Sequence, residues 1–294
     1  MNIIILISTP DSRGLVHKIS SNLLDFNIEK NDEFVDRESG QFFMRTEISI
    51  DSAESQNLGE NHAQIAESAL DSANAIKNKI YHRLRAILPK NSFLKVTLKR
   101  KKSLIIFATK ESHCLGDLLI KNYNNELDIE IKAVISNHRD LGDLVGKFGV
   151  PYFYISHDEK NYEDKMLQIC QDFTPDFIVL AKYMRILRPK FIAHYENRII
   201  NIHHSFLPAF IGANPYKQAY NRGVKIIGAT AHFVTSELDS GPIICQDILQ
   251  VNHTLLWRDM QKAGKNIERI VLARAVELAI DERIFIHNNK TIIF

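Results

Sequence analysis

Short apolar segments alternate with stretches of helical periodicity from residue 103 onward, and this alternation constrains the fold more than any other feature. Strands that alternate with helices form parallel βαβ units, because each helix carries the chain back to the starting edge of the sheet. The pattern predicts an α/β fold with a doubly wound, mostly parallel sheet. Strands are predicted at 104–108, 129–135, 151–155, 177–180, 199–202, 229–234 and 243–250, helices at 115–124, 140–148, 160–172, 188–194 and 258–280, and a terminal hairpin at 283–293.

The first 98 residues have a different pattern, in which strands and helices follow the order β-α-β-β-α-β. That order in a segment of this length is typical of a ferredoxin-like module. We therefore predict two domains, 1–98 and 103–294. In the first, strands are predicted at 3–7, 28–35, 41–50 and 93–98, helices at 15–26 and 63–88, and a polar loop at 51–62.

A basic run, Lys99-Arg100-Lys101-Lys102, joins the two predicted domains. Short basic runs commonly lie on exposed connections, so we interpret residues 99–102 as a solvated linker. A patch that binds nucleic acid is the less favoured interpretation. The whole chain has 37 Lys and Arg against 35 Asp and Glu, a formal net charge of +2, and this balance argues against a strongly basic nucleic-acid-binding protein.

Composition and missing motifs exclude several other classes of protein. No apolar run approaches the ~18–20 residues of a membrane span, so no membrane partner is expected. The apolar segment 1–7 is followed by charged residues and no cleavage site, and we interpret it as a strand rather than a signal peptide. Three scattered cysteines form no CxxC pair and favour a reducing cytoplasm. GxGxxG, P-loop, HExxH and GxSxG motifs are absent.

Segment 199–215 carries polar residues with catalytic potential at the end of a predicted strand. It reads Ile-Ile-Asn-Ile-His-His-Ser-Phe-Leu-Pro-Ala-Phe-Ile-Gly-Ala-Asn-Pro. Open α/β sheets bind ligands at the carboxyl ends of their strands. Asn201 and His203 are two residues apart and face the same side, where an amide donor and an imidazole can hold a developing oxyanion. The alternative is a buried polar pair that only satisfies the end of the strand.

A second segment, 228–242, combines a strand with a short acidic loop that contains Asp239. A carboxylate on such a loop can orient a water molecule and raise the basicity of a nearby imidazole. Considered alone, Asp239 is more simply explained as a turn residue. The adjacent His203 and His204 are expected to point to opposite faces of their strand, so we expect no metal ion between them.

Together the two segments resemble the formyltransferase-fold family that uses 10-formyltetrahydrofolate. The shared motif is Asn-x-His-x-Ser-x-Leu-Pro, followed some 36 residues after the His by Leu-Asp-x-Gly-Pro, and the resemblance covers roughly residues 103–250. It implies that Asn201, His203 and Asp239 are the catalytic residues. It also implies a folate pocket formed by Met184, Arg185, Ile186, Leu187, Ile199, Val234, Thr235, Ser236 and Leu238, with His204 and His232 either lining it or serving as structural residues.

Three features favour the branch of this family that hydrolyses its substrate over the branch that passes the formyl group to an amine. The loop 108–117 carries carboxylates and lacks the glycines that would hold a substrate phosphate. Segments 113–119, 180–185 and 201–211 resemble the hydrolytic enzymes. Finally, the first 98 residues resemble an ACT domain, a sensor module, and this implies an effector site at Asp11, Gly14, Leu15 and Asn27.

The resemblance implies a hydrolase that converts 10-formyltetrahydrofolate to formate and tetrahydrofolate by cleaving the C–N bond of a formamide-like group. Asn201 and protonated His203 would stabilise the oxyanion, and Asp239 would orient the attacking water. It further implies a homo-oligomer, methionine and glycine as effectors, a role in balancing the one-carbon folate pool and supplying formate for purine synthesis, and no metal or cofactor beyond the folate substrate. The alternatives are a formyltransferase with an amine acceptor and a sensor protein with an inactive enzyme domain.

Overall fold

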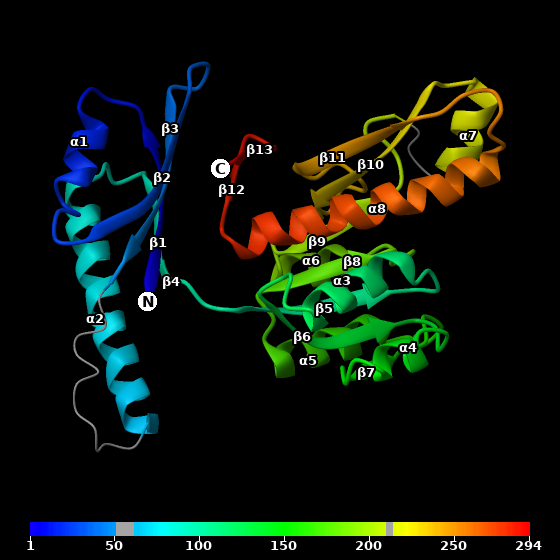
Figure 1. Ribbon diagram of the computed structural model, residues 1–294, viewed down its shortest axis with the longest axis horizontal. Helices are drawn as coiled ribbons and strands as arrows, with labels where there is room; N and C mark the ends of the chain where they lie inside the picture. Colours follow the sequence, from blue (N-terminus) through cyan, green and yellow to red (C-terminus); the bar gives the residue numbers. More distant parts are fainter. Residues whose placement is uncertain (51–61, 210–213) are drawn as a thin grey trace. The chain divides into compact units, whose positions relative to one another are not determined.

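The computed structural model describes residues 1–50, 62–209 and 214–294 (Figure 1). The chain divides into two compact units, Met1–Arg100 and Lys101–Ile293, and each is described by itself. The polar stretch 51–62, predicted as a loop, lies outside the described residues except for His62, which begins a helix. Residues 210–213 of the motif segment also lie outside them.

The first unit is an antiparallel sheet with the strand order β2-β3-β1-β4 and two helices on one face. Alternate residues of β1 (Ile3, Ile5 and Ile7) are buried in one core with Ile19 of α1 and Ile80 of α2. This arrangement confirms the predicted β-α-β-β-α-β order. The elements are β1 (Asn2–Pro10), α1 (Leu15–Ser20), β2 (Asn27–Asp36), β3 (Gln41–Ser49), α2 (His62–Ile87) and β4 (Phe93–Leu98).

The second unit contains a seven-stranded sheet with the order β11-β10-β9-β8-β5-β6-β7. The five strands from β5 to β9 pair in parallel, while β10 and β11 are antiparallel, so the prediction of a mostly parallel sheet is confirmed. A separate hairpin follows near the C-terminus. The strands are β5 (Lys102–Ala108), β6 (Ile129–Ser136), β7 (Tyr152–Tyr154), β8 (Phe177–Ala181), β9 (Ile199–His203), β10 (Ile226–Phe233) and β11 (Ile243–Gln250), and the hairpin is β12 (Ile284–His287) with β13 (Lys290–Ile293).

Helices cover both faces of this sheet, as a doubly wound fold requires. One core joins the sheet to α3, α4, α7 and α8, and a second core on the other face joins it to α5 and α6. Ile200 and Ile202 of β9 belong to the first core and Ile199 to the second, because successive strand residues point to opposite faces. The helices are α3 (His113–Tyr123), α4 (Gly142–Gly146), α5 (Tyr162–Phe173), α6 (Pro189–His194), α7 (Pro215–Arg222) and α8 (Trp257–Ile280).

The strand order reverses between β5 and β8. From β5 the chain winds outward through β6 to β7, and then returns to the other side of β5 to form β8 and β9. The loops after β5 and β8 therefore diverge at their carboxyl ends and mark the switch point, where sheets of this kind typically have a ligand-binding crevice.

Three elements differ from the prediction. Lys102, expected in the solvated linker, lies in β5 and is buried, and its ammonium donates a hydrogen bond to the carboxylate of Glu282. Helix α1 ends at Ser20 rather than near Phe26, because the backbone N–H groups of Asn22 and Leu23 bond to the carbonyls three residues earlier, as in turns, and not four residues earlier as in an α-helix. Helix α7, which was not predicted, begins at Pro215 and stops before Gly223 at φ 70°.

Among the residues that the structure describes, no helix is both long enough and apolar enough to cross a bilayer.

Gly264 of α8 is required by the packing of Tyr216 from α7. A methyl group at position 264 would lie 2.0 Å from the Tyr216 hydroxyl oxygen and 2.3 Å from Cζ. We expect Gly264→Ala to lower the free energy of unfolding by about 1–3 kcal/mol, because the added methyl group would overlap Tyr216. This loss is expected even though alanine is favoured over glycine in a helix by about 1 kcal/mol. Gly116→Ala in α3 is the matched control, because nothing lies within 4 Å of its added methyl group, and it should stabilise slightly. Urea unfolding of both variants tests this, and equal stabilisation would contradict the assigned clash.

Candidate active site

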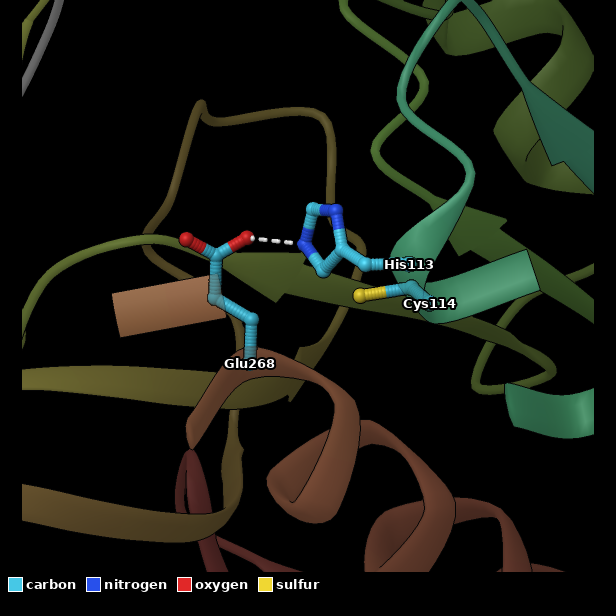
Figure 2. Close-up of side chains that lie close together, drawn as sticks. All are labelled: His113, Cys114 and Glu268. Carbon is cyan, nitrogen blue, oxygen red and sulfur yellow. Dashed lines mark hydrogen bonds and ion pairs between the residues drawn. The ribbon is translucent and has the colours of Figure 1, made fainter. Parts of the chain in front are cut away.

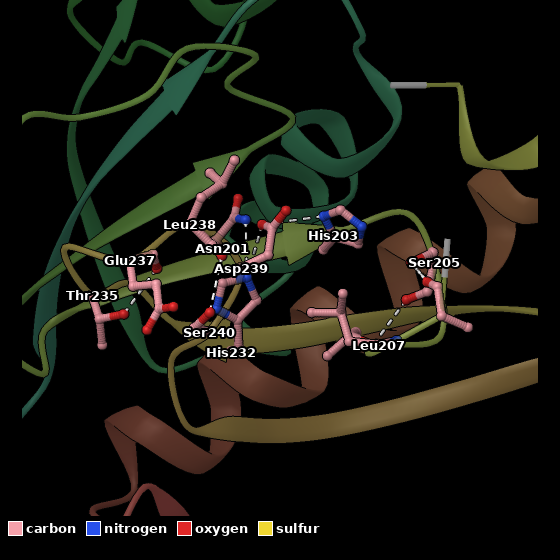
Figure 3. A network of polar contacts seen from close by, with 12 residues as sticks. Asn201, His203, Ser205, Leu207, His232, Thr235, Glu237, Leu238, Asp239 and Ser240 are labelled. Atoms are coloured by element: carbon pink, nitrogen blue, oxygen red, sulfur yellow. Dashed lines mark hydrogen bonds and ion pairs between the residues drawn. The ribbon is translucent and has the colours of Figure 1, made fainter. Parts of the chain in front are cut away.

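Strand β9 and the loop between β10 and β11 bring three polar side chains together (Figure 3). Asn201 and His203 lie on the same side of β9 at its carboxyl end. Asp239 comes from the loop after β10 and has a backbone φ of 54°, a left-handed conformation that aspartate tolerates better than most residues. Gly241 allows the loop to pass close to β10, since a Cβ there would lie 1.8 Å from the Phe233 carbonyl oxygen.

His203 and Asp239 form a direct pair. Nδ1 of His203 lies 3.2 Å from Oδ1 of Asp239, and both side chains are less than a tenth exposed. The other ring nitrogen, Nε2, is buried and has no hydrogen-bond partner among the described residues. A buried imidazole nitrogen without a partner is costly unless a ligand or a water molecule completes it. The geometry therefore orients Nε2 of His203 for a reacting group.

The hydrogen bonds around His232 fix the orientation of the Asn201 amide. Asn201 and His232 are directly opposite each other in the β9–β10 pairing. Nδ1 of His232 donates to the Phe233 carbonyl over 2.9 Å, and burial lowers the pKa of His232, which leaves Nε2 as an acceptor. The Asn201 amide nitrogen lies 3.2 Å from that Nε2 and donates to it. One amide N–H is thereby used, and the second is left for another acceptor.

The charge of Asp239 is stabilised by its neighbours. Burial alone would raise the pKa of Asp239, but the hydrogen bond from His203 is the largest of the interactions that lower it, and the net direction is downward. The ionised carboxylate accepts the hydrogen bond from Nδ1 of His203 and fixes the orientation of the imidazole ring.

A cavity of about 340 Å³ opens above these residues. Nearly all of the residues predicted for the site line it, including both His204 and His232. Ile199 does not line the cavity, because it lies two residues further from the end of β9 and packs in the core below. The predicted lining residues found here are Asn201, His203, Asp239, Met184, Arg185, Ile186, Leu187, Val234, Thr235, Ser236, Leu238, His204 and His232.

The orientation of His204 differs from the prediction. It was predicted to point away from His203, but the two ring centroids are 5.4 Å apart and both rings line the cavity. Strand β9 ends at His203, so the alternation of side chains no longer applies at the next residue. Burial, and after it the positive charge of Lys182, lowers the pKa of His204 to about 4. His204 is therefore a neutral residue beside His203.

Sequence reasoning missed Lys182, which also lines the cavity. It follows β8 with a φ of 61° and is 8% exposed. Its ammonium lies 3.2 Å from Oε2 of Glu268, a buried residue of α8 far away in the sequence. Lys182 and Glu268 are 86 positions apart, and no local sequence pattern indicates that they form a pair. Only the folded structure shows this contact.

Glu268 accepts bonds from several directions. Figure 2 shows His113 and Cys114, at the start of α3, facing Glu268. Nε2 of His113 donates to Oε2 over 2.8 Å, and the Tyr216 hydroxyl donates to Oε1 over 2.7 Å. Burial alone would raise the pKa of Glu268, but the bonds from His113 and Tyr216 and the charge of Lys182 lower it to about 2. His113, Cys114 and Glu268 could also ligate a metal, but the ammonium of Lys182 already supplies the cation that this carboxylate needs.

The first unit has its own cavity, of about 350 Å³, between the first βα turn and β2. Asp11, Gly14 and Leu15, predicted as effector-site residues, line it together with Glu33. Asn27 does not, because it begins β2 six residues before Glu33, or about 20 Å along the strand.

Comparisons with known proteins identify the family of this chain. Residues 102–276 match the family described as Formyl transferase. A formyltetrahydrofolate deformylase from Haemophilus influenzae is 46% identical, and the match covers 99% of this chain and 98% of that protein.

Solved structures give the same result. A crystal structure of a formyltetrahydrofolate deformylase from Pseudomonas syringae pv. tomato matches with a TM-score of 0.86 and 36% identity over 100% of this chain and 94% of that one. Glycinamide ribonucleotide transformylase 1 from Symbiobacterium toebii matches at a TM-score of 0.63 and 26% identity, over 66% of this chain and 94% of its own. The extent and identity of the full-length matches show that this chain belongs to the formyltetrahydrofolate deformylase family.

Proposed function

We propose that this chain is a hydrolase that converts 10-formyltetrahydrofolate and water to formate and tetrahydrofolate. The observation that carries this function is the imidazole of His203, which pairs with the Asp239 carboxylate through Nδ1, keeps Nε2 unpartnered among the described residues, and lines one cavity together with Asp239 and Asn201. Membership in the deformylase family agrees with it. Transfer of the formyl group to an amine is the less favoured alternative.

The reaction requires two things of the protein: it must stabilise the oxyanion that forms at the formyl oxygen, and it must transfer a proton to N10. Water attacks the formyl carbon, and the carbonyl oxygen becomes an oxyanion that accepts hydrogen bonds from Asn201 and from Nε2 of protonated His203. Asp239 holds the imidazole through Nδ1 and orients the water. When the C–N10 bond breaks, a proton from the attacking water reaches N10 with the help of Asp239, and formate leaves. We propose that these three residues act without a metal or a further cofactor.

The remaining cavity walls fit the folate. Segment 184–187 follows β8 on one side of the cavity, and segment 234–238 precedes Asp239 on the other. The exposed side chains of Met184, Ile186 and Leu238 offer apolar surface at the cavity. We place the pterin between these segments, with the formyl group toward Asn201 and His203.

We further propose that the first unit is an ACT domain that binds methionine or glycine. Asp11 and Glu33 line its cavity and can pair with the ammonium group of an amino acid. We also propose a homo-oligomer, because β2 is an edge strand of ten largely exposed residues that another copy could cover. The three free cysteines suit a reducing cytoplasm, where released formate would balance the folate pool and supply purine synthesis.

Asp239→Asn tests the central pair, since the amide keeps the shape of the side chain but loses its charge. We expect formate release to fall by roughly 10²–10⁴, mostly in kcat, because general acid–base help is lost while the folate contacts remain. The measurement is steady-state formate release with 10-formyltetrahydrofolate and no acceptor. A kcat within threefold of the wild type would remove Asp239 from the mechanism.

Asn201→Ala tests the oxyanion donor. Loss of one such donor costs about 10²–10³ in kcat. The matched control is Ile200→Val, one residue away on the opposite face of β9 and fully buried in the core. It should leave kcat close to the wild-type value, as measured in the same assay. If the two variants are equally active, Asn201 does not stabilise the transition state.

Asp11→Asn tests the effector site. Loss of a charge-assisted hydrogen bond of about 1.5–3 kcal/mol should raise the methionine concentration needed for half-maximal effect roughly 10- to 100-fold. Asp71→Asn, an exposed position of α2, is the control. Calorimetric titration with methionine and with glycine gives the affinities. Unchanged binding of both amino acids to Asp11→Asn would place the effector elsewhere.

A further inference from the structure

The crevice at the strand-order switch between β5 and β8 is where a doubly wound sheet is expected to bind a ligand. A protein named for glycinamide ribonucleotide shares this fold, so the fold itself leaves room for a second substrate. In this chain the candidate active-site cavity is bounded on that side by Lys182 and His204. No described residue of segment 109–123, which follows β5, lines the cavity.

At this switch point, side chains from three helices and from the residue that follows β8 meet. His113 begins α3, Lys182 follows β8, Tyr216 lies in α7 and Glu268 lies in α8, and the first three all contact the carboxylate of Glu268. We call these four residues the switch-point plug. All of its hydrogen bonds are charge-assisted, and its carboxylate is about 1% exposed.

The plug borders the reacting groups directly. Lys182 and His204 both line the cavity, and the rings of His204 and Tyr216 are 5.9 Å apart. His204 in turn lies beside His203. A molecule that reached the formyl carbon from the β5 side would have to displace this chain of contacts.

The plug is also a rigid structure. Tyr216 reaches Glu268 only because Gly264, one helical turn earlier on α8, has no side chain. Removing one partner from a buried, hydrogen-bonded charge is expensive, since the other charge remains buried. The plug therefore does not open easily to admit a substrate.

We propose that the switch-point plug of His113, Lys182, Tyr216 and Glu268 determines the acceptor: it excludes amines from the formyl group, so that water is the nucleophile. This inference rests on the proposed hydrolysis. In the excluded reaction, the amine nitrogen attacks the formyl carbon, the C–N10 bond breaks, and an amine proton moves to N10. The plug acts by occupying space, and the groups that stabilise the oxyanion are the same for both acceptors.

Two variants are designed to open the crevice by shortening one side chain of the plug. They are His113→Ala in α3 and Tyr216→Ala in α7. Each is incubated with 10-formyltetrahydrofolate and increasing glycinamide, a small primary amine, and both formate and N-formylglycinamide are measured. We expect wild-type protein to release formate whatever the amine concentration. The truncated variants should form at least about 10-fold more formylated amine than the wild-type protein. A factor of this size is what one additional methylene group typically costs a molecule that enters a closely fitting pocket.

Cys114 reports whether the crevice has opened. It is buried beside His113, and its thiol approaches the Glu268 carboxylate. In the truncated variants, a thiol reagent should label Cys114, as located by peptide mass spectrometry. Tyr216→Phe is the matched control, because it keeps the ring and loses only the hydroxyl, and it should leave Cys114 unlabelled and form no formylated amine.

The outcomes separate the possibilities. Labelled Cys114 with formate as the sole product would overturn the proposal, because an open crevice would then still exclude the amine. Unlabelled Cys114 in both truncations would also overturn it, because the plug would not be what closes the crevice. A wild-type protein that releases no formate would instead refute the proposed hydrolysis, on which the inference depends.

Discussion

The hydrogen bond between His203 and Asp239 is the interaction on which the rest of the site depends. It joins the end of β9 to the loop after β10, and it requires that loop to return closely to the sheet, which Gly241 permits. The antiparallel β9–β10 register then places His232 opposite Asn201. The pairing of β9 with β10 and the loop after β10 thus orient the Asn201 amide, the His203 imidazole and the Asp239 carboxylate together. Among the described residues, Nε2 of His203 has no hydrogen-bond partner and can therefore contact a reacting group.

The same unit holds a second buried charge, Glu268, whose partners come from helices α3 and α7 and from the residue that follows β8. Desolvation of an isolated carboxylate would be prohibitive, but His113, Tyr216 and Lys182 bind it and keep it ionised. This cluster lies beside Asn201, His203 and Asp239, the proposed catalytic residues, and shares none of them. The cluster lies at the strand-order switch, where such a fold commonly binds a ligand, and in our proposal its packing against α8 therefore determines which nucleophile reaches the formyl carbon.

Most of the fold could be predicted because its signals are local. Strand β11 and the hairpin at the C-terminus were predicted from short apolar runs and turn residues, and the structure has them there. Helix α7 was missed because it is short and follows a Pro- and Gly-containing segment, which reads as a loop. Lys102 was assigned to a linker because a basic residue in a basic run looks solvated, whereas its partner, Glu282, is 180 residues away.

The sequence by itself determined the order of the strands and of every helix except α7. It also determined the motif that contains Asn201, His203 and Asp239, and hence the resemblance to a family, because each of these depends on neighbouring residues and on side-chain chemistry. The tertiary structure alone decided which long-range partners meet. Strand pairing and helix packing placed His232 against Asn201 and Glu268 against Lys182, and turned His204 into the cavity. Such contacts are set by the energy of packing the whole unit, and no pattern along the chain encodes them.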